Sequence, residues 1–190
     1  MGIIYSLGEL YQEDIVWTEK VLGQEMTFHS TWGLFSPKAV DNGSHRLLHA
    51  VKTTQAMDVL DLCCGYGPIG LTLAKAKPEA HFHLVDKDFV AVEMAKVTAE
   101  ANDLKNTQIY LSNAFSHVEK TDFDLILSNI PAKVGKELLY IIIADAKKHL
   151  KPGGQFVVVT IKSLAPFIKR EMETIFGNYD RLGQKEQYTI

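Results

Sequence analysis

The sequence contains little cysteine, which argues against disulfide bonds and against cysteine-based metal sites. Two of the 190 residues are cysteines, the neighbours Cys63 and Cys64. Adjacent cysteines are poor disulfide partners because the peptide between them resists the geometry of the bridge. The cysteine and histidine spacings of zinc sites are also missing. We therefore expect no metal and two reduced thiols, which are typical of a cytoplasmic protein.

Long apolar runs and an excess of positive charge are lacking as well. The most apolar block, residues 138–144, is far shorter than the roughly 20 residues of a membrane-spanning helix, and no secretory signal is recognisable at the start. We therefore expect no membrane contact. The net charge is −3, whereas a large nucleic-acid-binding surface usually makes a domain basic. This charge argues against tight independent binding of RNA or DNA, but it allows a local basic patch.

What the sequence does contain is a glycine-rich turn between an apolar run and an amphipathic segment, within residues 57–75. The apolar run predicts a buried strand, and Pro68 suits the first position of the helix that follows. Gly65, Gly67 and Gly70 have the G-x-G-x-x-G spacing of dinucleotide-binding folds, which alone is a weak signal. Because glycines at such a turn let a ligand approach bare backbone, the stretch predicts a nucleotide-type binding loop.

Asp61 distinguishes between two classes of ligand for this loop. Its carboxylate lies at the carboxyl end of the predicted strand, four residues before Gly65. A carboxylate there would repel a pyrophosphate and attract a ligand with an ammonium or sulfonium group. Asp61 therefore favours S-adenosylmethionine over NAD. A carboxylate that only caps the next helix is the alternative.

Strand and helix patterns alternate along the rest of the chain. Such alternation predicts an α/β fold with a Rossmann-like, mostly parallel sheet of seven strands and helices on both faces. Before it, alternating residues on either side of Gly23 predict a β-hairpin, so we expect residues 1–35 to be a short β extension packed on a main domain of residues 36–190. Beyond the turn, the predicted strands are 81–86, 109–111, 124–129, 155–161 and two within 179–190, and the predicted helices are 89–101, 136–150 (stopped by the breaker 151–154) and 164–176.

Four aromatic residues stand out near the predicted hairpin: Trp17, Phe28, Trp32 and Phe35. Because aromatic side chains bury a large area, we expect them to anchor the extension on the main domain. The alternative is that one of them stacks on a substrate.

The stretch Val59–Gly67, Val-Leu-Asp-Leu-Cys-Cys-Gly-Tyr-Gly, resembles the first motif, D-x-G-x-G-x-G, of class I S-adenosylmethionine-dependent methyltransferases. Cys63 stands where the first glycine of that motif usually stands, and it leaves less room beside the methionine part of the cofactor. The resemblance implies the class I methyltransferase fold and S-adenosylmethionine as the cofactor.

The stretch after Gly33 resembles the F-S-x-x-x-x-D-x-G-S/T-x-L-L signature of the small-domain methyltransferases, which include ribosomal RNA guanine-N2 methyltransferases. In such proteins the segment lies over the cofactor pocket, which implies that Asp41, Gly43 and Ser44 close the site. A helix that Ser44 caps, running through Leu47, Leu48 and Val51, would explain the same residues.

The stretch Asn129-Ile130-Pro131-Ala132 resembles the N-P-P-F/Y motif of amino-group methyltransferases. In that motif the Asn side chain and a following carbonyl accept hydrogen bonds from the target nitrogen and align it with the methyl group. Ile130 replaces the first proline, and Ala132 replaces the aromatic residue that stacks on a flat target such as a flipped base. Either Trp17, Trp32 or Phe35 supplies the stacking surface, or the substrate is not a base.

Other strand ends complete the expected site. Asp86 lies 21 residues after Gly65, where both nucleotide-binding families bind ribose hydroxyls, and Asp88 is the better candidate for a helix cap. The resemblance implies that Asp61, Cys63, Gly65 and Gly67 bind the methionine part of the cofactor, Asp86 the ribose, Asn113 and either Ala114 or Phe115 the adenine, and Asn129 and Pro131 the accepting nitrogen beside the cofactor.

We therefore predict an S-adenosylmethionine-dependent methyltransferase that N-methylates an exocyclic amine in RNA, of the guanine N2 type, with ribosomal RNA as its partner and a monomer or homodimer as its assembly. Methylation of a small molecule or of a protein amide is the alternative among enzymes. A catalytically silent domain that binds the cofactor or a partner chain is the alternative of another class, and an NAD-dependent enzyme comes third.

Overall fold

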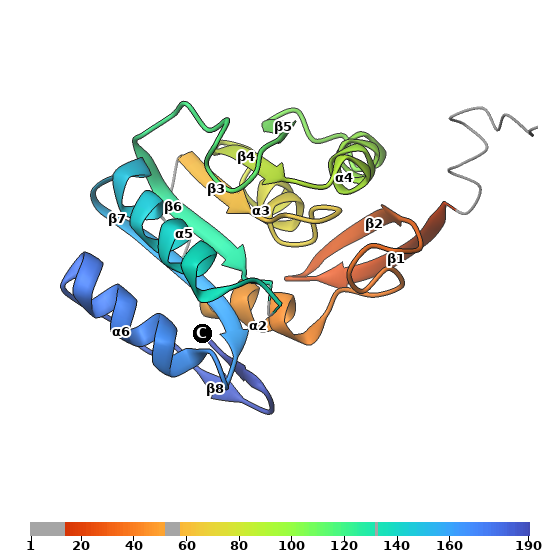
Figure 1. Ribbon diagram of the computed structural model, residues 1–190. Coiled ribbons are helices and arrows are strands. Elements are labelled where there is room, and N and C mark those ends of the chain that lie inside the picture. The colour runs from red at the N-terminus through yellow and green to blue at the C-terminus, as the bar shows by residue number, and fades with distance from the viewer. Residues whose placement is uncertain (1–13, 52–57, 132) are drawn as a thin grey trace, which may run out of the picture.

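The computed structural model describes residues 14–51, 58–131 and 133–190, and its centre is a seven-stranded sheet (Figure 1). The strand order is β5-β4-β3-β6-β7-β9-β8. The strands from β5 to β7 are parallel, whereas β9 is antiparallel to β7 and β8 is antiparallel to β9. This confirms the predicted α/β architecture. The strands are β3 (Asp58–Leu62), β4 (His81–Asp86), β5 (Thr107–Leu111), β6 (Phe123–Asn129), β7 (Leu150–Ile161), β8 (Gln184–Lys185) and β9 (Tyr188–Thr189).

Helices cover both faces of the sheet, as predicted. Successive strand side chains point to opposite faces, so Val59 of β3 packs against one helical layer and Leu60 against the other. The first layer holds α2 (Asn42–Ala50), α3 (Gly70–Ala76) and α4 (Phe89–Ala101), and the second holds α5 (Lys136–His149) and α6 (Ala165–Phe176). In Figure 1 the second layer lies in front of the sheet. None of the described helices is long and apolar enough to cross a bilayer.

The carboxyl ends of β3, β4 and β6 meet at one edge of the sheet. Because these strands are parallel and in register, Asp61 of β3 lies opposite Leu84 of β4 on one side and Leu127 of β6 on the other. Asp86 and Asn129 are the last residues of β4 and β6. The fold therefore gathers the predicted site residues at the edge where open α/β sheets bind ligands.

The predicted hairpin is confirmed: β1 (Ile15–Val21) and β2 (Gln24–Ser30) pair antiparallel. Leu22 and Gly23 in the turn both have positive φ, 50° and 77°, which suits a two-residue hairpin loop. The hairpin stays outside the main sheet. It is held instead by α4, where Asn102 accepts from the Thr27 amide at 3.1 Å and Thr98 Oγ1 accepts from the His29 amide at 3.0 Å.

An aromatic cluster joins the hairpin to the glycine loop. The rings of Trp17, Phe28 and Tyr66 have centroids 5.5 to 5.9 Å apart in each pair. This confirms the anchoring role predicted for Trp17 and Phe28. The same prediction is wrong for Trp32 and Phe35, whose exposed fractions are 55% and 70%. These two residues lie in the loop after β2, where Leu34 and Val40 pack against the core instead.

Two predicted helix starts are wrong. Helix α3 begins at Gly70, and Pro68 lies in the turn before it, which the Leu71 amide closes by donating to the Gly67 carbonyl at 3.0 Å. Helix α2 begins at Asn42 and ends at Ala50, and its cap is Asp41 rather than Ser44, because the Asp41 side chain accepts the free amides of the first turn.

The helix before the predicted breaker does end there, at His149, but the strand that follows begins earlier than predicted. Strand β7 begins at Leu150, and residues 151–154 form an irregularity inside it, where the register with β6 jumps from Phe123–Leu150 to Leu125–Gln155. Gly153, with φ 83°, supplies the left-handed backbone that such a bulge needs.

Replacing Phe28 with Ala tests the aromatic cluster. The Phe28 ring is fully buried, so Phe28→Ala should lower the free energy of unfolding by about 3–5 kcal/mol, measured by urea denaturation. Phe35→Ala is the matched control, and because that ring is exposed its effect should stay below about 0.5 kcal/mol. Equal effects of the two changes would contradict the packing described above.

Candidate active site

The glycine loop between β3 and α3 has two different glycines. Gly65 and Gly67 both have positive φ, 58° and 88°, which favours glycine. A Cβ at Gly67 would lie 2.5 Å from a methyl carbon of Leu71, so packing of the loop on α3 requires this glycine. A Cβ at Gly65 would have no atom within 4 Å. The backbone of Gly65 therefore borders open space, where a ligand can contact it.

Cys63 occupies a backbone position that favours glycine. Its φ is 60°, in the left-handed region that side chains disfavour, and this explains why the motif that it resembles has a glycine there. Burial, with smaller contributions from Asp86 and Asp61, raises the pKa of the Cys63 thiol to about 12. The thiol is therefore protonated at neutral pH and is a poor nucleophile.

Asp61 is buried under the glycine loop, with 1% of its surface exposed. Its Oδ2 accepts from the Gly70 amide at 2.7 Å, so this oxygen caps α3. Its Oδ1 is buried without a hydrogen-bond partner among the described residues. Burial raises the pKa of Asp61 to about 7, the Gly70 amide counteracts part of that rise, and Asp86 adds to it. One oxygen thus fits the helix-cap alternative, and the other remains available to a cationic group.

Asp86 connects the end of β4 to the glycine loop. Its Oδ2 accepts from the Gly65 amide at 2.9 Å, and its Oδ1 accepts from the Asp88 amide at 3.0 Å. Each oxygen keeps a lone pair for a further donor. Asp88 caps α4 by accepting from the Val90 amide at 2.8 Å, as predicted.

Asn113 and Ala114 follow β5 at the same edge. Asn113 is exposed, and Ala114 has φ 50° while its carbonyl accepts from Ser112 Oγ at 2.6 Å. Phe115 points into the core instead, where its ring centroid lies 4.5 Å from that of His149. The expectation that Phe115 could pack on an adenine is therefore wrong, and Ala114 is the member of that pair which stays near the surface.

Asn129 is fixed by two residues of the α2 segment. It shares a face of β6 with Leu125 and Leu127, so its side chain points toward α2. Its Nδ2 donates to Asp41 Oδ2 at 3.0 Å and to Ser44 Oγ at 3.1 Å. Because a carboxylate can only accept, the nitrogen must face α2. The carbonyl oxygen Oδ1 therefore faces away from Asp41, and no described residue donates to it.

Asp41 is the centre of this network. It also accepts from the Gly43 amide at 2.7 Å and from Ser44 Oγ at 2.5 Å. A Cβ at Gly43 would lie 2.9 Å from Asp41 Oδ1 and 3.0 Å from a ring carbon of Tyr188, so glycine lets the chain approach both. The sequence motifs singled out Asp41, Gly43 and Ser44, but they did not indicate the bonds to Asn129.

Tyr66 is a positioning residue that the sequence reasoning missed. Its ring is buried between the hairpin and the glycine loop, and its hydroxyl lies 3.0 and 3.1 Å from the carbonyls of Ser36 and Ala39. It therefore holds the segment that leads to Asp41. A tyrosine between two glycines of such a loop gave no signal in the sequence.

The segment after Asn129 explains one departure from the N-P-P-F/Y motif. Ile130 is buried, and its amide donates to the Val159 carbonyl at 3.1 Å, a bond that a proline could not make. Pro131 follows at the surface. Ala132 lies outside the described residues.

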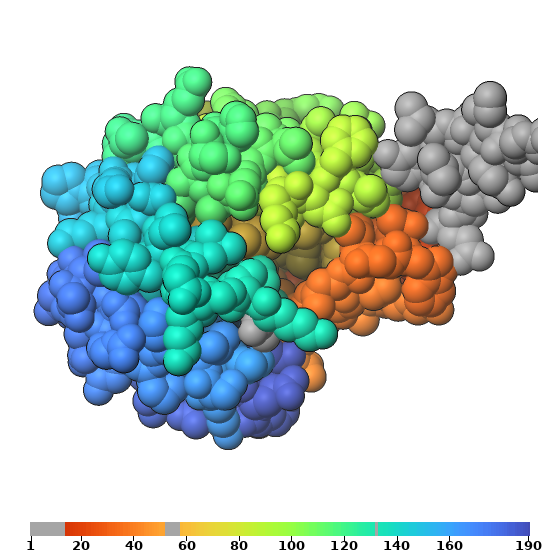
Figure 2. Space-filling view, viewed as in Figure 1, coloured from red at the N-terminus to blue at the C-terminus, as the bar shows by residue number. Residues whose placement is uncertain are grey.

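These elements surround a hollow at the sheet edge. In Figure 2 the orange loop before α2, the lime and green segments after β4 and β5, and the teal segment after β6 border it, and the gold glycine loop is visible at its base. The structure thus brings together most of the predicted site residues: Asp61, Cys63, Gly65, Gly67, Asp86, Asn113, Ala114, Asn129 and Pro131.

Substitutions at Cys63 test the left-handed backbone. Cys63→Val should lower the free energy of unfolding by about 1–3 kcal/mol, because a β-branched side chain tolerates this φ poorly. Cys63→Gly should stay within about 1 kcal/mol of the wild type, because glycine adopts the conformation freely. Urea denaturation measures both, and a Val variant as stable as the Gly variant would contradict the assigned conformation.

The pH dependence of stability tests the state of Asp61. Its pKa is raised from 3.8 to about 7 by folding, so between these values the unfolded chain releases a proton that the folded chain keeps. Asp61 should therefore make the cofactor-free protein less stable as the pH rises from about 4 to about 7. Asp61→Asn should make the slope of Tm against pH less negative over this range, and an unchanged slope would show that Asp61 ionises normally.

Comparison with known proteins places the chain in a family. Residues 25–190 match the family model "Methyltransferase small domain". YbxB of Bacillus subtilis, an uncharacterized protein, is 34% identical over 92% of this chain and 88% of its own length. Ribosomal RNA small subunit methyltransferase C of Haemophilus influenzae is 34% identical over 88% of this chain and 51% of its own length.

A solved structure agrees with these relatives. The 16S rRNA N2 methyltransferase RsmC of T. thermophilus, in complex with AdoMet and guanosine, superimposes with a TM-score of 0.81 and 31% identity over 92% of this chain and 48% of RsmC. The chain thus spans about half the length of the ribosomal RNA methyltransferases that it matches. The chain belongs to the methyltransferase small domain family, within the class I S-adenosylmethionine-dependent methyltransferases with a Rossmann-like fold.

Proposed function

We propose that the protein transfers the methyl group of S-adenosylmethionine to an exocyclic amine of RNA, of the guanine N2 type. The observation that carries the proposal is the fixed amide of Asn129, whose free oxygen lies at the sheet edge that holds the glycine loop. The choice of acceptor is supported by two of the relatives, which are named ribosomal RNA methyltransferases, and by the guanosine in RsmC. We further infer that the protein acts in the cytoplasm, as a monomer or homodimer.

The residues of the glycine loop fit the cofactor. The unpartnered Oδ1 of Asp61 and the open backbone at Gly65 suit a cationic methionine group that lies against bare amides. Bound S-adenosylmethionine would supply the electrophilic methyl group. In our assignment Asp61, Cys63, Gly65 and Gly67 hold the methionine part, Asp86 the ribose hydroxyls, Asn113 and Ala114 the adenine, and Asn129 borders the methyl group.

Asn129 is proposed to position the accepting nitrogen. Its Oδ1 would accept one N–H of the amine, and a carbonyl in the segment of Pro131 would accept the other, so that the nitrogen lone pair is aligned with the methyl group. Transfer between two aligned groups depends mainly on positioning, which requires acceptors rather than a strong base. Asp41 and Ser44 contribute by holding the amide in one orientation.

A stacking surface for the base is proposed in the loop between β2 and α2. Trp17 is the less suitable candidate because it is half-buried and its ring packs against Phe28 and Tyr66. Phe35 and Trp32 expose 70% and 55% of their surface and precede Asp41 in the same loop. The ammonium of Lys38 lies 4.4 Å from the centre of the Trp32 ring. Exposed aromatic rings next to a cation suit an RNA base and its phosphate.

Asn129→Ala tests the proposal. It should reduce transfer of labelled methyl groups to ribosomal RNA by at least about 100-fold, because alignment of the nitrogen is lost. Binding of S-adenosylhomocysteine, measured by calorimetry, should change less than about threefold, since the residues assigned to the cofactor remain. Gln108→Ala, which changes an exposed amide on β5, is the control and should keep full activity.

A labelling experiment with the wild-type protein distinguishes the proposed RNA methyltransferase from an enzyme with another acceptor and from a catalytically silent domain. Methyl label in the RNA fraction of a cell extract supports the proposal, whereas label in the protein or metabolite fraction alone assigns the enzyme to another acceptor. Cofactor binding without label in any fraction indicates a catalytically silent domain. Turnover that survives Asn129→Ala would show that Asn129 is structural.

A further inference from the structure

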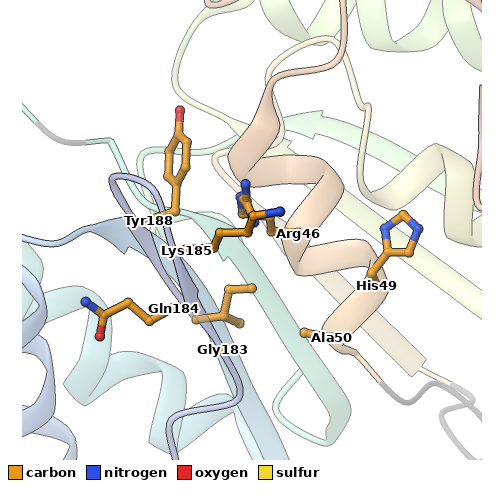
Figure 3. Close-up of a pocket in the computed structure, with 8 residues that line it drawn as sticks. Arg46, His49, Ala50, Gly183, Gln184, Lys185 and Tyr188 are labelled. Carbon is orange, nitrogen blue, oxygen red and sulfur yellow. The ribbon is translucent and has the colours of Figure 1, made fainter.

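A second hollow lies between helix α2 and the hairpin formed by β8 and β9. It has a volume of about 370 Å³. Figure 3 shows Arg46 and Ala50 of α2 beside Gly183 and Lys185 of the C-terminal segment, whereas the ring of His49, which also lines the hollow, lies on the other side of α2 in this view. A smaller hollow of about 270 Å³ adjoins it and shares Arg46 and His49. None of the residues assigned to the cofactor or to the accepting nitrogen lines either hollow.

The lining of the hollow is basic. Arg46 and Lys185 carry positive charge, His49 can gain one, and α2 contains no acidic residue. Glu186 is the acidic neighbour, and it is 53% exposed and paired with Arg46 Nη2 at 2.9 Å. The main-chain oxygen of Ile190, which also lines the hollow, accepts the amides of Leu182 and Gly183. The protein as a whole has a net charge of −3, so this local excess of positive charge is a distinct feature.

Arg46 has an unused donor in the wall of the hollow. Its Nε is buried and has no hydrogen-bond partner among the described residues, although 21% of the side chain remains exposed. A buried donor without a partner is costly. The guanidinium presents its donors as a planar fork that matches the oxygens of a phosphate, and one of these donors, Nη2, is paired with Glu186. An oxyanion bound in the hollow, which Arg46 lines, would supply a partner for this group.

The hollow is close to the proposed catalytic amide. Tyr188 lines it and also packs against Gly43, which is two residues from Asp41, the partner of Asn129. Arg46 follows Asn42 by four residues, about one helical turn or 5.4 Å along the axis. Arg46 is therefore on the short helix whose first turn holds the Asn129 amide, so a phosphate bound at Arg46 can belong to the same RNA as a base placed at Asn129.

We propose that this hollow binds a backbone phosphate of the RNA next to the methylated nucleotide, with Arg46 and Lys185 as the principal ligands and His49 at the rim. The inference rests on the proposed function, because it assumes an RNA substrate. It also explains how a chain of negative net charge can bind RNA, since a few cations beside the site suffice to hold one phosphate.

The test measures binding and methylation of ribosomal RNA by Arg46→Gln and Lys185→Gln. Each change should raise the Kd for RNA about fivefold or more and should reduce the slope of log Kd against log salt concentration by about one. Binding of S-adenosylhomocysteine should not change. Arg46→Lys keeps the charge but loses the fork, so it should recover part of the affinity and the full salt slope. Lys105→Gln is the control, because Lys105 is 82% exposed in the loop before β5, and it should leave RNA binding unchanged.

Three results would overturn the inference. The first is a folded Arg46→Gln variant that binds and methylates RNA like the wild type with the same salt slope. The second is a Lys105→Gln effect as large as that of Lys185→Gln, which would indicate nonspecific charge. The third is a rise in Tm with inorganic phosphate that needs Arg46, without any effect on RNA binding, which would assign the hollow to free phosphate. The proposed function fails separately, when the wild type methylates no RNA.

Discussion

The carboxylate of Asp41 is the group on which the arrangement of the site depends. It accepts hydrogen bonds from the first turn of α2, from the Ser44 hydroxyl and from the Asn129 amide. One residue thus starts the helix, attaches it to the end of β6 and orients the side chain that we assign to the methyl acceptor. Networks of this kind are rigid because several donors converge on one carboxylate, and loss of one bond leaves another group unpaired.

The glycine loop is supported from two sides. Below it, Asp61 ties β3 to the start of α3, and Asp86 ties the end of β4 to Gly65. Beside it, Tyr66 packs on Trp17 and Phe28 of the hairpin. The hairpin precedes the glycine-rich motif and is only partly covered by the family match, yet its packing determines where the loop can lie.

Much of the fold and part of the site could be predicted from the sequence. Local patterns were sufficient for the strands, for the hairpin at Gly23 and for Asp88 as a helix cap, because each depends on residues close together in the chain. The bulge within β7 depends on its register with β6, and the bond between Asp41 and Asn129 spans 88 residues, so neither is visible in a local pattern. Aromatic residues near the hairpin look alike in sequence, although Phe28 is buried and Phe35 is exposed.

The contacts of the Tyr66 hydroxyl connect the glycine loop to the loop before α2, and this connection affects the free energies of binding to both loops. Tyr66 lies between two glycines assigned to the cofactor, and its hydroxyl contacts the carbonyls of Ser36 and Ala39 in the loop that carries the exposed aromatic rings. A ligand that orders one of these segments lowers the entropy lost when the other is ordered. Binding of cofactor and acceptor at the proposed sites would then be energetically coupled, and each would change the affinity of the other by the same factor.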